Sequence, residues 1–194
     1  MKPSAGQVRI IGGSLRGRRV PVPDLPGLRP TPDRVRETLF NWLSPHISGA
    51  RVLDLFAGTG ALGLEAASRG ASEVTLVESQ RAAQAALRET LQRLALPKVN
   101  LVATDAQLFL ESGAGQYEVI FLDPPFASGL LAPALAAIQR RGRLVPGGFC
   151  YVEQARESPP PELPAGWTLH RSGQAGEVGY HLLHVPQRDL PGHV

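Results

Sequence analysis

The stretch from residue 52 to 63, VLDLFAGTGALG, constrains the fold of this chain more than any other. It begins as a short apolar run, is interrupted by glycines that can adopt positive φ, and continues from Ala61 into a segment rich in helix formers. This order predicts a β-strand, a glycine-rich turn and an α-helix. Such a turn points free backbone N–H groups beyond the carboxyl end of the strand, where open α/β sheets bind ligands. We therefore expect a small-molecule site here.

The ligand is indicated by the residue just before the turn. Gly58-x-Gly60-x-x-Gly63 matches the dinucleotide-binding fingerprint, which alone is a weak signal. Asp54, however, would repel a pyrophosphate and attract a cation. S-adenosylmethionine (SAM) carries an ammonium, a sulfonium and one carboxylate, so it suits this loop better; a purely structural turn capped by Asp54 is the alternative. The loop residues predicted to contact SAM are Asp54, Phe56, Ala57, Gly58, Thr59 and Gly60.

The composition is that of a globular protein, since 43% of the 194 residues are hydrophobic and 19% are charged. One domain of ordinary size is expected. No apolar run is long enough to cross a bilayer and the start of the chain lacks a signal-peptide core, which predicts a cytoplasmic protein. Cys150 is the only cysteine, so an intrachain disulfide and a multi-cysteine zinc site are excluded. The five histidines show no metal-ligand spacing, and we expect no metal.

Basic charge is concentrated at one end of the chain. The net charge is +3, yet residues 1–36 contain eight Lys or Arg and only two Asp, an excess of +6. A cluster dominated by arginine is typical of phosphate binding, although it also fits a solvated face with scattered ion pairs. The arginines predicted to bind phosphates are Arg9, Arg16, Arg18, Arg29, Arg34 and Arg36.

These arginines are predicted to lie on a small hairpin and a helix. Strand-like segments at residues 7–11 and 17–22 flank a glycine turn. Thr31 followed by Pro32 predicts a helix start, with the threonine as N-cap. Arg34 and Arg36 lie off the apolar stripe of that helix and are expected to reach outward.

After residue 49 strand and helix patterns alternate, which predicts a mostly parallel sheet with helices on both faces. The expected strands are residues 51–56, 73–78, 99–102, 117–122 and 148–153, followed by an antiparallel hairpin of residues 167–171 and 178–185. The helix over 79–94 is expected to begin with Ser79 as N-cap. We divide the chain into a basic extension (1–48), a main domain (49–188) and a tail (189–194).

Further SAM contacts are predicted where the second and third of these strands end. An acidic residue about 20 positions after the glycine turn meets the ribose hydroxyls in such folds, and Glu78 stands there, followed by Ser79. Asp105 could accept a hydrogen bond from the adenine amino group, with Ala106 packed near the ring. Both acidic residues could instead serve to start the helices that follow them.

Asp123-Pro124-Pro125-Phe126 follows the apolar run at residues 119–122. Two prolines cannot extend a central strand, so the chain must leave the sheet there in a rigid shape. The Asp123 carboxylate and the Pro124 carbonyl are then two acceptors for the hydrogens of an exocyclic amino group. Phe126 offers a face on which a base can stack, a contact worth about 1–3 kcal/mol.

The motif Asp123-Pro-Pro-Phe126 resembles that of SAM-dependent methyltransferases acting on planar amino groups, and Asp54-x-Phe56-x-Gly58-x-Gly60 is similar to their cofactor loop. More specific strings are RIIGG at 9–13, RGR at 16–18 and RPTPDRVRETLFNW at 29–42. With GEVGY at 176–180, they resemble the bacterial enzymes that methylate a guanine N2 in 16S ribosomal RNA, the small-subunit methyltransferase D family. The resemblance covers nearly the whole chain.

This resemblance implies a Rossmann-like class I SAM-dependent methyltransferase fold, with a mostly parallel seven-stranded sheet and an antiparallel carboxy-terminal hairpin. It implies methylation of the exocyclic N2 of a guanine in 16S rRNA, with SAM as the cofactor and S-adenosylhomocysteine as the product. The partner would be the assembled or nearly assembled small subunit, bound by a monomer without membrane contact. The implied catalytic residues are Asp123, Pro124, Pro125 and Phe126, and the implied phosphate ligands are the six arginines above.

Other functions remain open at this point. Adenine N6 is an alternative target for the same motif, and only the amino-terminal resemblance favours guanine. An NAD-type dehydrogenase fits the literal glycine pattern but leaves the Asp-Pro-Pro-Phe segment without a role. A non-catalytic RNA-binding module that keeps SAM as a structural ligand is the third possibility.

Overall fold

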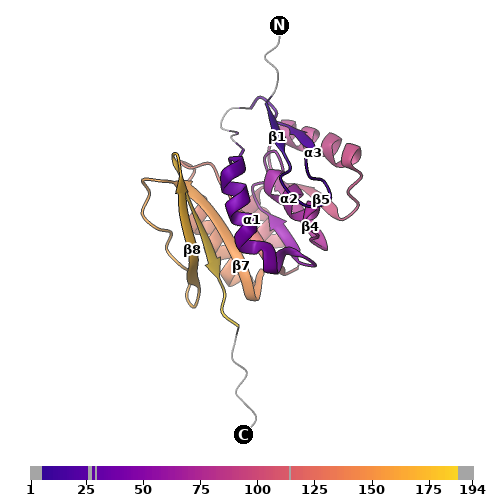
Figure 1. The fold of residues 1–194 in the computed structure, drawn as a ribbon. Coiled ribbons are helices and arrows are strands. Elements are labelled where there is room, and N and C mark those ends of the chain that lie inside the picture. Colours follow the sequence, from indigo (N-terminus) through magenta and orange to yellow (C-terminus); the bar gives the residue numbers. More distant parts are fainter. Residues whose placement is uncertain (1–5, 26–27, 29, 114, 188–194) are drawn as a thin grey trace.

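The computed structural model describes residues 6–25, 28, 30–113 and 115–187 (Figure 1). The strands are β1 (Gln7–Arg9), β2 (Arg19–Pro21), β3 (Arg51–Asp54), β4 (Glu73–Glu78), β5 (Val99–Ala103), β6 (Tyr117–Leu122), β7 (Leu144–Ala155), β8 (Thr168–Ala175) and β9 (Val178–His184). The helices are α1 (Asp33–Ile47), α2 (Ala61–Ser68), α3 (Arg81–Leu94), α4 (Ala106–Ser112) and α5 (Leu131–Arg140). Arg29 and the tail at 189–194 lie outside the described residues.

Seven of these strands form one sheet in the order β5-β4-β3-β6-β7-β9-β8. The strands β3 to β7 pair in parallel, whereas β9 runs antiparallel to both β7 and β8. The expected sheet, with its antiparallel carboxy-terminal hairpin, is therefore confirmed. The chain runs outward from β3 through β4 to β5 and then returns to place β6 on the other side of β3. Open α/β sheets bind their ligands at such a reversal of strand order.

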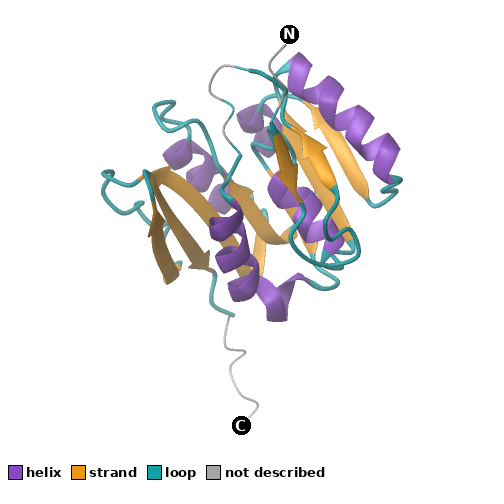
Figure 2. Cartoon of the chain, turned by 45° about the horizontal axis from the view of Figure 1, so that its top comes forward, coloured by secondary structure: helices purple, strands orange, loops and turns teal. Residues whose placement is uncertain are grey.

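Successive side chains of each strand face opposite sides of the sheet, and each side is covered by its own helices. Val52 of β3 belongs to a core shared with α1, α2 and α3. Its neighbour Leu53 belongs to a second core shared with α4 and α5. Figure 2 shows these layers of helices around the strands. No helix in the described part of the chain is long and apolar enough to span a membrane.

The strands β1 and β2 form a separate antiparallel pair at the amino terminus. Ile10 and Val20 of this hairpin are buried against Leu64 of α2, with leucines of α3 around them. The basic hairpin predicted from the sequence is thus packed on the outside of α2 and α3. Its strands are shorter than expected, because the chain turns through residues 12–17 before pairing resumes.

Several predicted boundaries are wrong by a few residues. The strand expected at 148–153 is longer, because β7 pairs with β9 as far as Ala155. The strand expected at 51–56 ends at Asp54, where the glycine turn begins. The helix expected from Ser79 begins at Arg81, and Ser79 is exposed instead of acting as N-cap.

Candidate active site

Asp54 ends β3 at the carboxyl edge of the sheet, and only 2% of the residue is exposed. Its Oδ2 atom accepts a hydrogen bond from the Gly63 backbone N–H at 3.0 Å. Its Oδ1 atom is buried and has no hydrogen-bond partner among the described residues. Burial raises the pKa of Asp54 to about 7; the Gly63 N–H opposes this shift, while Glu78 and Glu153 add to it. A buried carboxylate oxygen without a partner is costly unless a donor or cation meets it.

Gly63 allows α2 to lie this close to the sheet. A Cβ atom at this position would lie 2.3 Å from Cδ2 of Leu76 and 3.2 Å from Oδ2 of Asp54. A larger residue would require Leu76 or α2 to move. The third glycine of the motif therefore has a packing role.

The glycine-rich turn between β3 and α2 is held from the neighbouring strand. Gly58 and Gly60 have positive φ, at 55° and 79°. Glu78, at the end of β4, accepts hydrogen bonds from the Gly58 N–H at 2.8 Å and from the Gln80 N–H at 2.7 Å. Glu78 thus links the turn to the start of α3, which agrees with the structural alternative that it helps to begin the following helix. Its contact with a ribose stays a prediction.

The other residues predicted to contact SAM surround this turn. Phe56 is half-buried, whereas Ala57 and Thr59 are 7% and 5% exposed. The exposed Asp105 caps α4, because its Oδ1 accepts the N–H groups of the residues two and three positions later, at 2.8 and 3.2 Å. Ala106 is partly buried beside it. Their contacts with an adenine ring stay predictions.

The Asp123-Pro124-Pro125-Phe126 segment follows β6 directly at the same edge. Because β3 and β6 are neighbours, with Asp54 paired to Phe121, the segment leaves the sheet beside Asp54. Asp123 is partly exposed, Pro124 is buried and Pro125 is exposed. Phe126 is 48% exposed, which is unusual for a large apolar side chain. The segment therefore combines two fixed oxygen acceptors with an open aromatic face.

A second carboxyl group lies next to Asp123, and the sequence analysis did not predict it. The Thr31 hydroxyl donates to Oε1 of Glu153 at 2.7 Å and lies 3.5 Å from Oδ2 of Asp123. The Tyr151 hydroxyl also donates to Oε1 of Glu153, at 2.9 Å. Burial raises the pKa of Asp123 well above its usual range; the carboxylates of Glu153 and Asp54 add to this shift, and the Thr31 hydroxyl opposes it. Burial also raises the pKa of Glu153.

This contact also explains why Thr31 is not the N-cap of α1. The helix begins at Asp33, with Pro32 in the N-cap position and no side-chain cap. The Thr31 hydroxyl is directed to Glu153 instead, across a sequence separation of 122 residues. The predicted N-cap is therefore wrong, because the Thr31 hydroxyl donates to the distant Glu153 and not to the start of the helix.

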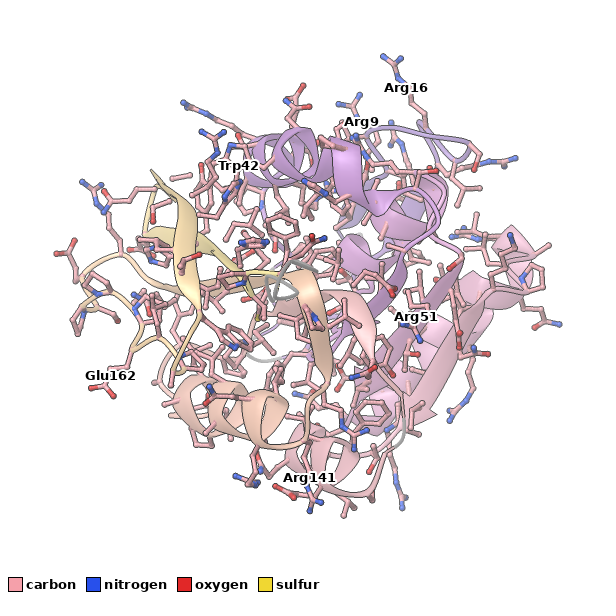
Figure 3. All side chains as sticks on the ribbon, turned by 90° about the horizontal axis from the view of Figure 1, so that it is seen from below. Arg9, Arg16, Trp42, Arg51, Arg141 and Glu162 are labelled. Carbon is pink, nitrogen blue, oxygen red and sulfur yellow. The ribbon has the colours of Figure 1, made fainter. Side chains whose placement is uncertain are left out.

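Four of the predicted RNA-binding arginines are exposed: Arg9, Arg16, Arg18 and Arg34. Figure 3 shows Arg9 and Arg16 extending from the amino-terminal hairpin, on a different side from Arg141. A hollow of about 230 Å³ between this hairpin and α1 includes Arg9 and Arg16 in its lining. None of the residues predicted to contact SAM or the target base lines this hollow. Phosphate binding by the exposed arginines stays a prediction.

Arg36 contradicts the prediction that it reaches outward, because its side chain is 0% exposed. Its guanidinium donates to the carbonyl oxygens of Thr31 at 3.1 Å and Arg9 at 2.9 Å, and it pairs with Asp33 and with Glu65. Glu65 is itself fully buried and accepts two backbone N–H groups of the hairpin, both at 2.8 Å. Arg36 therefore holds the hairpin and α1 onto α2, and it cannot bind RNA phosphates.

The sequence contains signals for two buried carboxylates, Glu65 and Glu153, that were not predicted. Glu65 is the one charged residue in the apolar helix sequence ALGLEAAS, and Glu153 follows the apolar run FCYV in a central strand. Acidic side chains at such positions are buried only when they are paired or hydrogen-bonded. The pattern indicated buried carboxylates but not their partners. Within the described residues, no three His, Cys, Asp or Glu side chains form a group that could hold a metal ion.

The site fits SAM better than a dinucleotide. The unpaired Oδ1 of Asp54 calls for a cationic group, which SAM has and a pyrophosphate lacks. The glycine turn follows the carboxyl end of β3, and Glu78 lies beside it. Fold and site together define a Rossmann-like SAM-dependent methyltransferase.

Comparisons with known proteins agree with this class. The family model "Conserved hypothetical protein 95" matches residues 8–184. Ribosomal RNA small subunit methyltransferase D of Escherichia coli K12 is 48% identical over 188 residues, covering 97% of this chain and 93% of that protein. The chain belongs to the ribosomal RNA small subunit methyltransferase D family, which decides against an NAD-type dehydrogenase.

Solved structures lead to the same family. The Escherichia coli protein yhhF superimposes with a TM-score of 0.87 at 44% identity, over 94% of this chain and all of that one. A Thermus thermophilus 16S rRNA N2 methyltransferase, solved with AdoMet and guanosine, has a TM-score of 0.66 at 26% identity. That alignment covers 95% of this chain and 50% of the Thermus protein.

Proposed function

We propose that this protein transfers a methyl group from SAM to the exocyclic N2 of a guanine in 16S ribosomal RNA. The observation that carries the proposal is the Asp123-Pro124-Pro125-Phe126 segment beside Asp54, at the point where the strand order reverses. The named activities of the relatives support it. Residues 1–48 would form the RNA-contacting extension and residues 49–188 the methyltransferase domain.

The chain's own residues would hold both partners of the reaction. SAM, when bound, supplies an electrophilic methyl group on a sulfonium. Asp54, Glu78 and the turn at 56–60 would hold the cofactor, with Ser79, Asp105 and Ala106 around its adenosine. The cationic side of SAM would meet the Asp54 oxygen that has no protein partner.

The acceptors at the end of β6 would orient the target nitrogen. A guanine N2 lone pair is delocalised into the ring and is a poor nucleophile at neutral pH. Asp123 and the Pro124 carbonyl would accept the two N2 hydrogens, which lets the lone pair point toward the methyl group and stabilises the positive charge that develops on nitrogen. Phe126 would stack on the base after it leaves its helix, a step that costs a few kcal/mol.

The exposed arginines of the hairpin and α1 would bind the flanking phosphates, so binding should weaken steeply with salt. By family likeness, we propose the assembled or nearly assembled small subunit as the substrate particle, and a monomer acting in the cytoplasm as the enzyme.

The decisive experiment is the transfer of labelled methyl from SAM to small subunits that lack the modification. Naked 16S RNA and DNA serve as parallel substrates, and the product is digested to nucleosides. Label in N2-methylguanosine is the expected result. Label in N6-methyladenosine would overturn the target but not the chemistry, and SAM binding without transfer to any substrate would favour the non-catalytic RNA-binding module.

Replacing Phe126 by Ala should lower kcat/KM for the RNA by about 5- to 150-fold, because one base–aromatic stack of about 1–3 kcal/mol is lost. Phe126→Tyr keeps the ring and should retain most activity. The Kd for SAM should not change in either variant. Equal activity of Phe126→Ala and wild type would contradict a stacking role.

Replacing Asp54 by Asn should weaken SAM binding by about tenfold, because a hydrogen bond to a charged group is lost. It should also stabilise the free protein at pH 8. The folded-state pKa of Asp54, about 7, lies above its ordinary value of 3.8. The wild-type carboxyl therefore costs stability as the pH rises toward 7, by roughly 4 kcal/mol in total.

The unpaired amide that Asp54→Asn introduces would offset part of this gain, so a net stabilisation of about 1–3 kcal/mol is expected at pH 8. The gain should shrink at pH 5. Denaturant unfolding at both pH values and titration calorimetry with SAM measure these effects, with the exposed Asp24→Asn as the control. A gain that does not change with pH would show that Asp54 is not the titrating group.

A further inference from the structure

The Thr31 hydroxyl connects the carboxyl groups of Asp123 and Glu153. One hydroxyl lies between two carboxyl groups, at 2.7 Å from Glu153 and 3.5 Å from Asp123. Thr31 and Glu153 are 5% and 3% exposed, so bulk water does not solvate this bridge freely. A hydroxyl has one hydrogen and can donate to only one of the two carboxyl groups at a time.

Two arrangements of one proton satisfy this network. If Glu153 is ionised, the Thr31 hydroxyl donates its hydrogen to Glu153. Its oxygen lone pair then faces Asp123, so Asp123 must be protonated to donate a hydrogen bond to Thr31. If Glu153 is protonated, it donates to Thr31, and the Thr31 hydrogen is free to point to an ionised Asp123. Only the second arrangement leaves Asp123 charged and ready to accept hydrogen bonds from an amino group.

We propose that Thr31 and Glu153 are positioning residues that share one proton with Asp123, and that the reactive form is the one in which Glu153 holds the proton. This inference rests on the proposed function for its role in turnover, although the proton sharing itself does not depend on RNA. After methyl transfer, the target nitrogen loses one proton to the Asp123 carboxylate. The pair then holds two protons, and one of them must pass to water from the partly exposed Asp123 before the arrangement with a single shared proton is restored.

The surroundings of the pair favour such sharing. Asp123 faces Glu153 from β7, Asp54 from β3 and the Thr31 hydroxyl from the segment before α1. Glu153 faces Tyr151, whose hydroxyl donates to it, and Tyr180 lies next to Tyr151. Two of these neighbours, Glu153 and Asp54, are carboxyl groups, and no cation is among the groups that shift the pKa of Asp123. Carboxyl groups that share a site titrate as a pair, and the pKa of one of them is strongly raised.

The position of Thr31 is itself fixed from outside the site. The buried Arg36 guanidinium donates to the Thr31 carbonyl oxygen at 3.1 Å and to the Arg9 carbonyl oxygen at 2.9 Å. The amino-terminal hairpin and the hydroxyl bridge are therefore connected through a single side chain.

Two measurements test the inference, and the first does not require RNA. In protein labelled with ¹³C at aspartate carboxyls, the Asp123 signal, assigned with Asp123→Asn, is followed as a function of pH. Glu153→Gln keeps the volume and an oxygen acceptor but cannot titrate, so the Asp123 midpoint should fall by about one pH unit. The control is Glu118→Gln, which removes a carboxylate at the opposite end of β6 and should leave the midpoint unchanged.

The second measurement is the pH profile of kcat. Its acid limb should move to lower pH by about the same amount in Glu153→Gln. Thr31→Val should lower kcat by about tenfold with little change in KM for the RNA, and Thr31→Ser should restore it because it restores the hydroxyl.

The two proposals can fail separately. An Asp123 midpoint that is the same in wild type and Glu153→Gln overturns proton sharing, whatever the activity. If Glu153→Gln does not fold, equal kcat in Thr31→Val and Thr31→Ser overturns it instead. If wild type transfers no methyl group to any substrate, the proposed function fails, while the carboxyl titration still decides the inference.

Discussion

Replacing Asp123 by Asn is expected to lower kcat for methyl transfer by about 100- to 1,000-fold, the loss typical of removing one preorganised hydrogen-bonding group from an active site. The substitution keeps the shape of the side chain. It replaces an acceptor oxygen by an NH₂ group, which would face the hydrogens of the target amino group. It also removes the negative charge that stabilises the developing positive charge on the nitrogen.

Binding and stability should separate this effect from a general loss of structure. The Kd for SAM should stay within about threefold of wild type, because the proposed cofactor contacts come from Asp54 and the glycine turn and not from Asp123. Burial raises the pKa of Asp123, so its ionisation costs stability as the pH rises, and Asp123→Asn should unfold at higher denaturant concentration at pH 8. Single-turnover methyl transfer and urea unfolding measure these quantities. A variant that keeps more than about a tenth of kcat would refute the proposed role of Asp123.

Replacing Arg36 by Met should lower the free energy of unfolding by about 3–5 kcal/mol, the usual cost of breaking a buried ion pair by removing one partner. Arg36 is fully buried, and its removal takes one cation from Glu65 and one donor from each of two backbone carbonyls. Glu65 keeps its ion pair with Arg69 and the two hairpin N–H groups. Arg36→Lys should not restore stability. The planar guanidinium of arginine donates to Glu65 and both carbonyls at once, and the compact ammonium of lysine cannot.

Arg34→Met is the matched control, since Arg34 lies two residues away on α1 but is exposed. Its stability should remain within about 0.5 kcal/mol of wild type. Its affinity for RNA should fall, and the slope of log K against log salt should decrease by about one. Chemical unfolding and filter binding at several salt concentrations distinguish the two variants. Comparable stability of Arg36→Met and Arg34→Met would contradict the role of Arg36 in anchoring the hairpin.

The features that could be predicted from the sequence depend on neighbouring residues. The strands Glu73–Glu78 and Tyr117–Leu122 were predicted with their observed bounds, because each is a short apolar run between clear breaks. The glycine turn and the Asp-Pro-Pro-Phe segment follow from backbone rules that apply to a few consecutive residues. Strand alternation then predicted that both segments meet at one edge of a parallel sheet.

Tertiary contacts decided the roles of single polar side chains. Thr31 has the local signature of an N-cap, yet its hydroxyl binds Glu153, 122 residues later. Arg36 lies off the apolar stripe of its helix, yet the amino-terminal hairpin covers it and Glu65 meets it from α2. Neither outcome could be predicted, because local patterns do not show which distant group will cover a given helix face.

The sequence by itself determined the class of fold and placed Asp54 and the Asp-Pro-Pro-Phe segment at one edge of the sheet, because glycine, proline and apolar periodicity act over short distances. Only the tertiary structure decided which charges are buried and which face solvent. A buried carboxylate or guanidinium is stable only when partners from other elements surround it, and folding alone brings those partners together. Arg36 is therefore a structural residue, whereas Arg34, two positions earlier, remains on the surface.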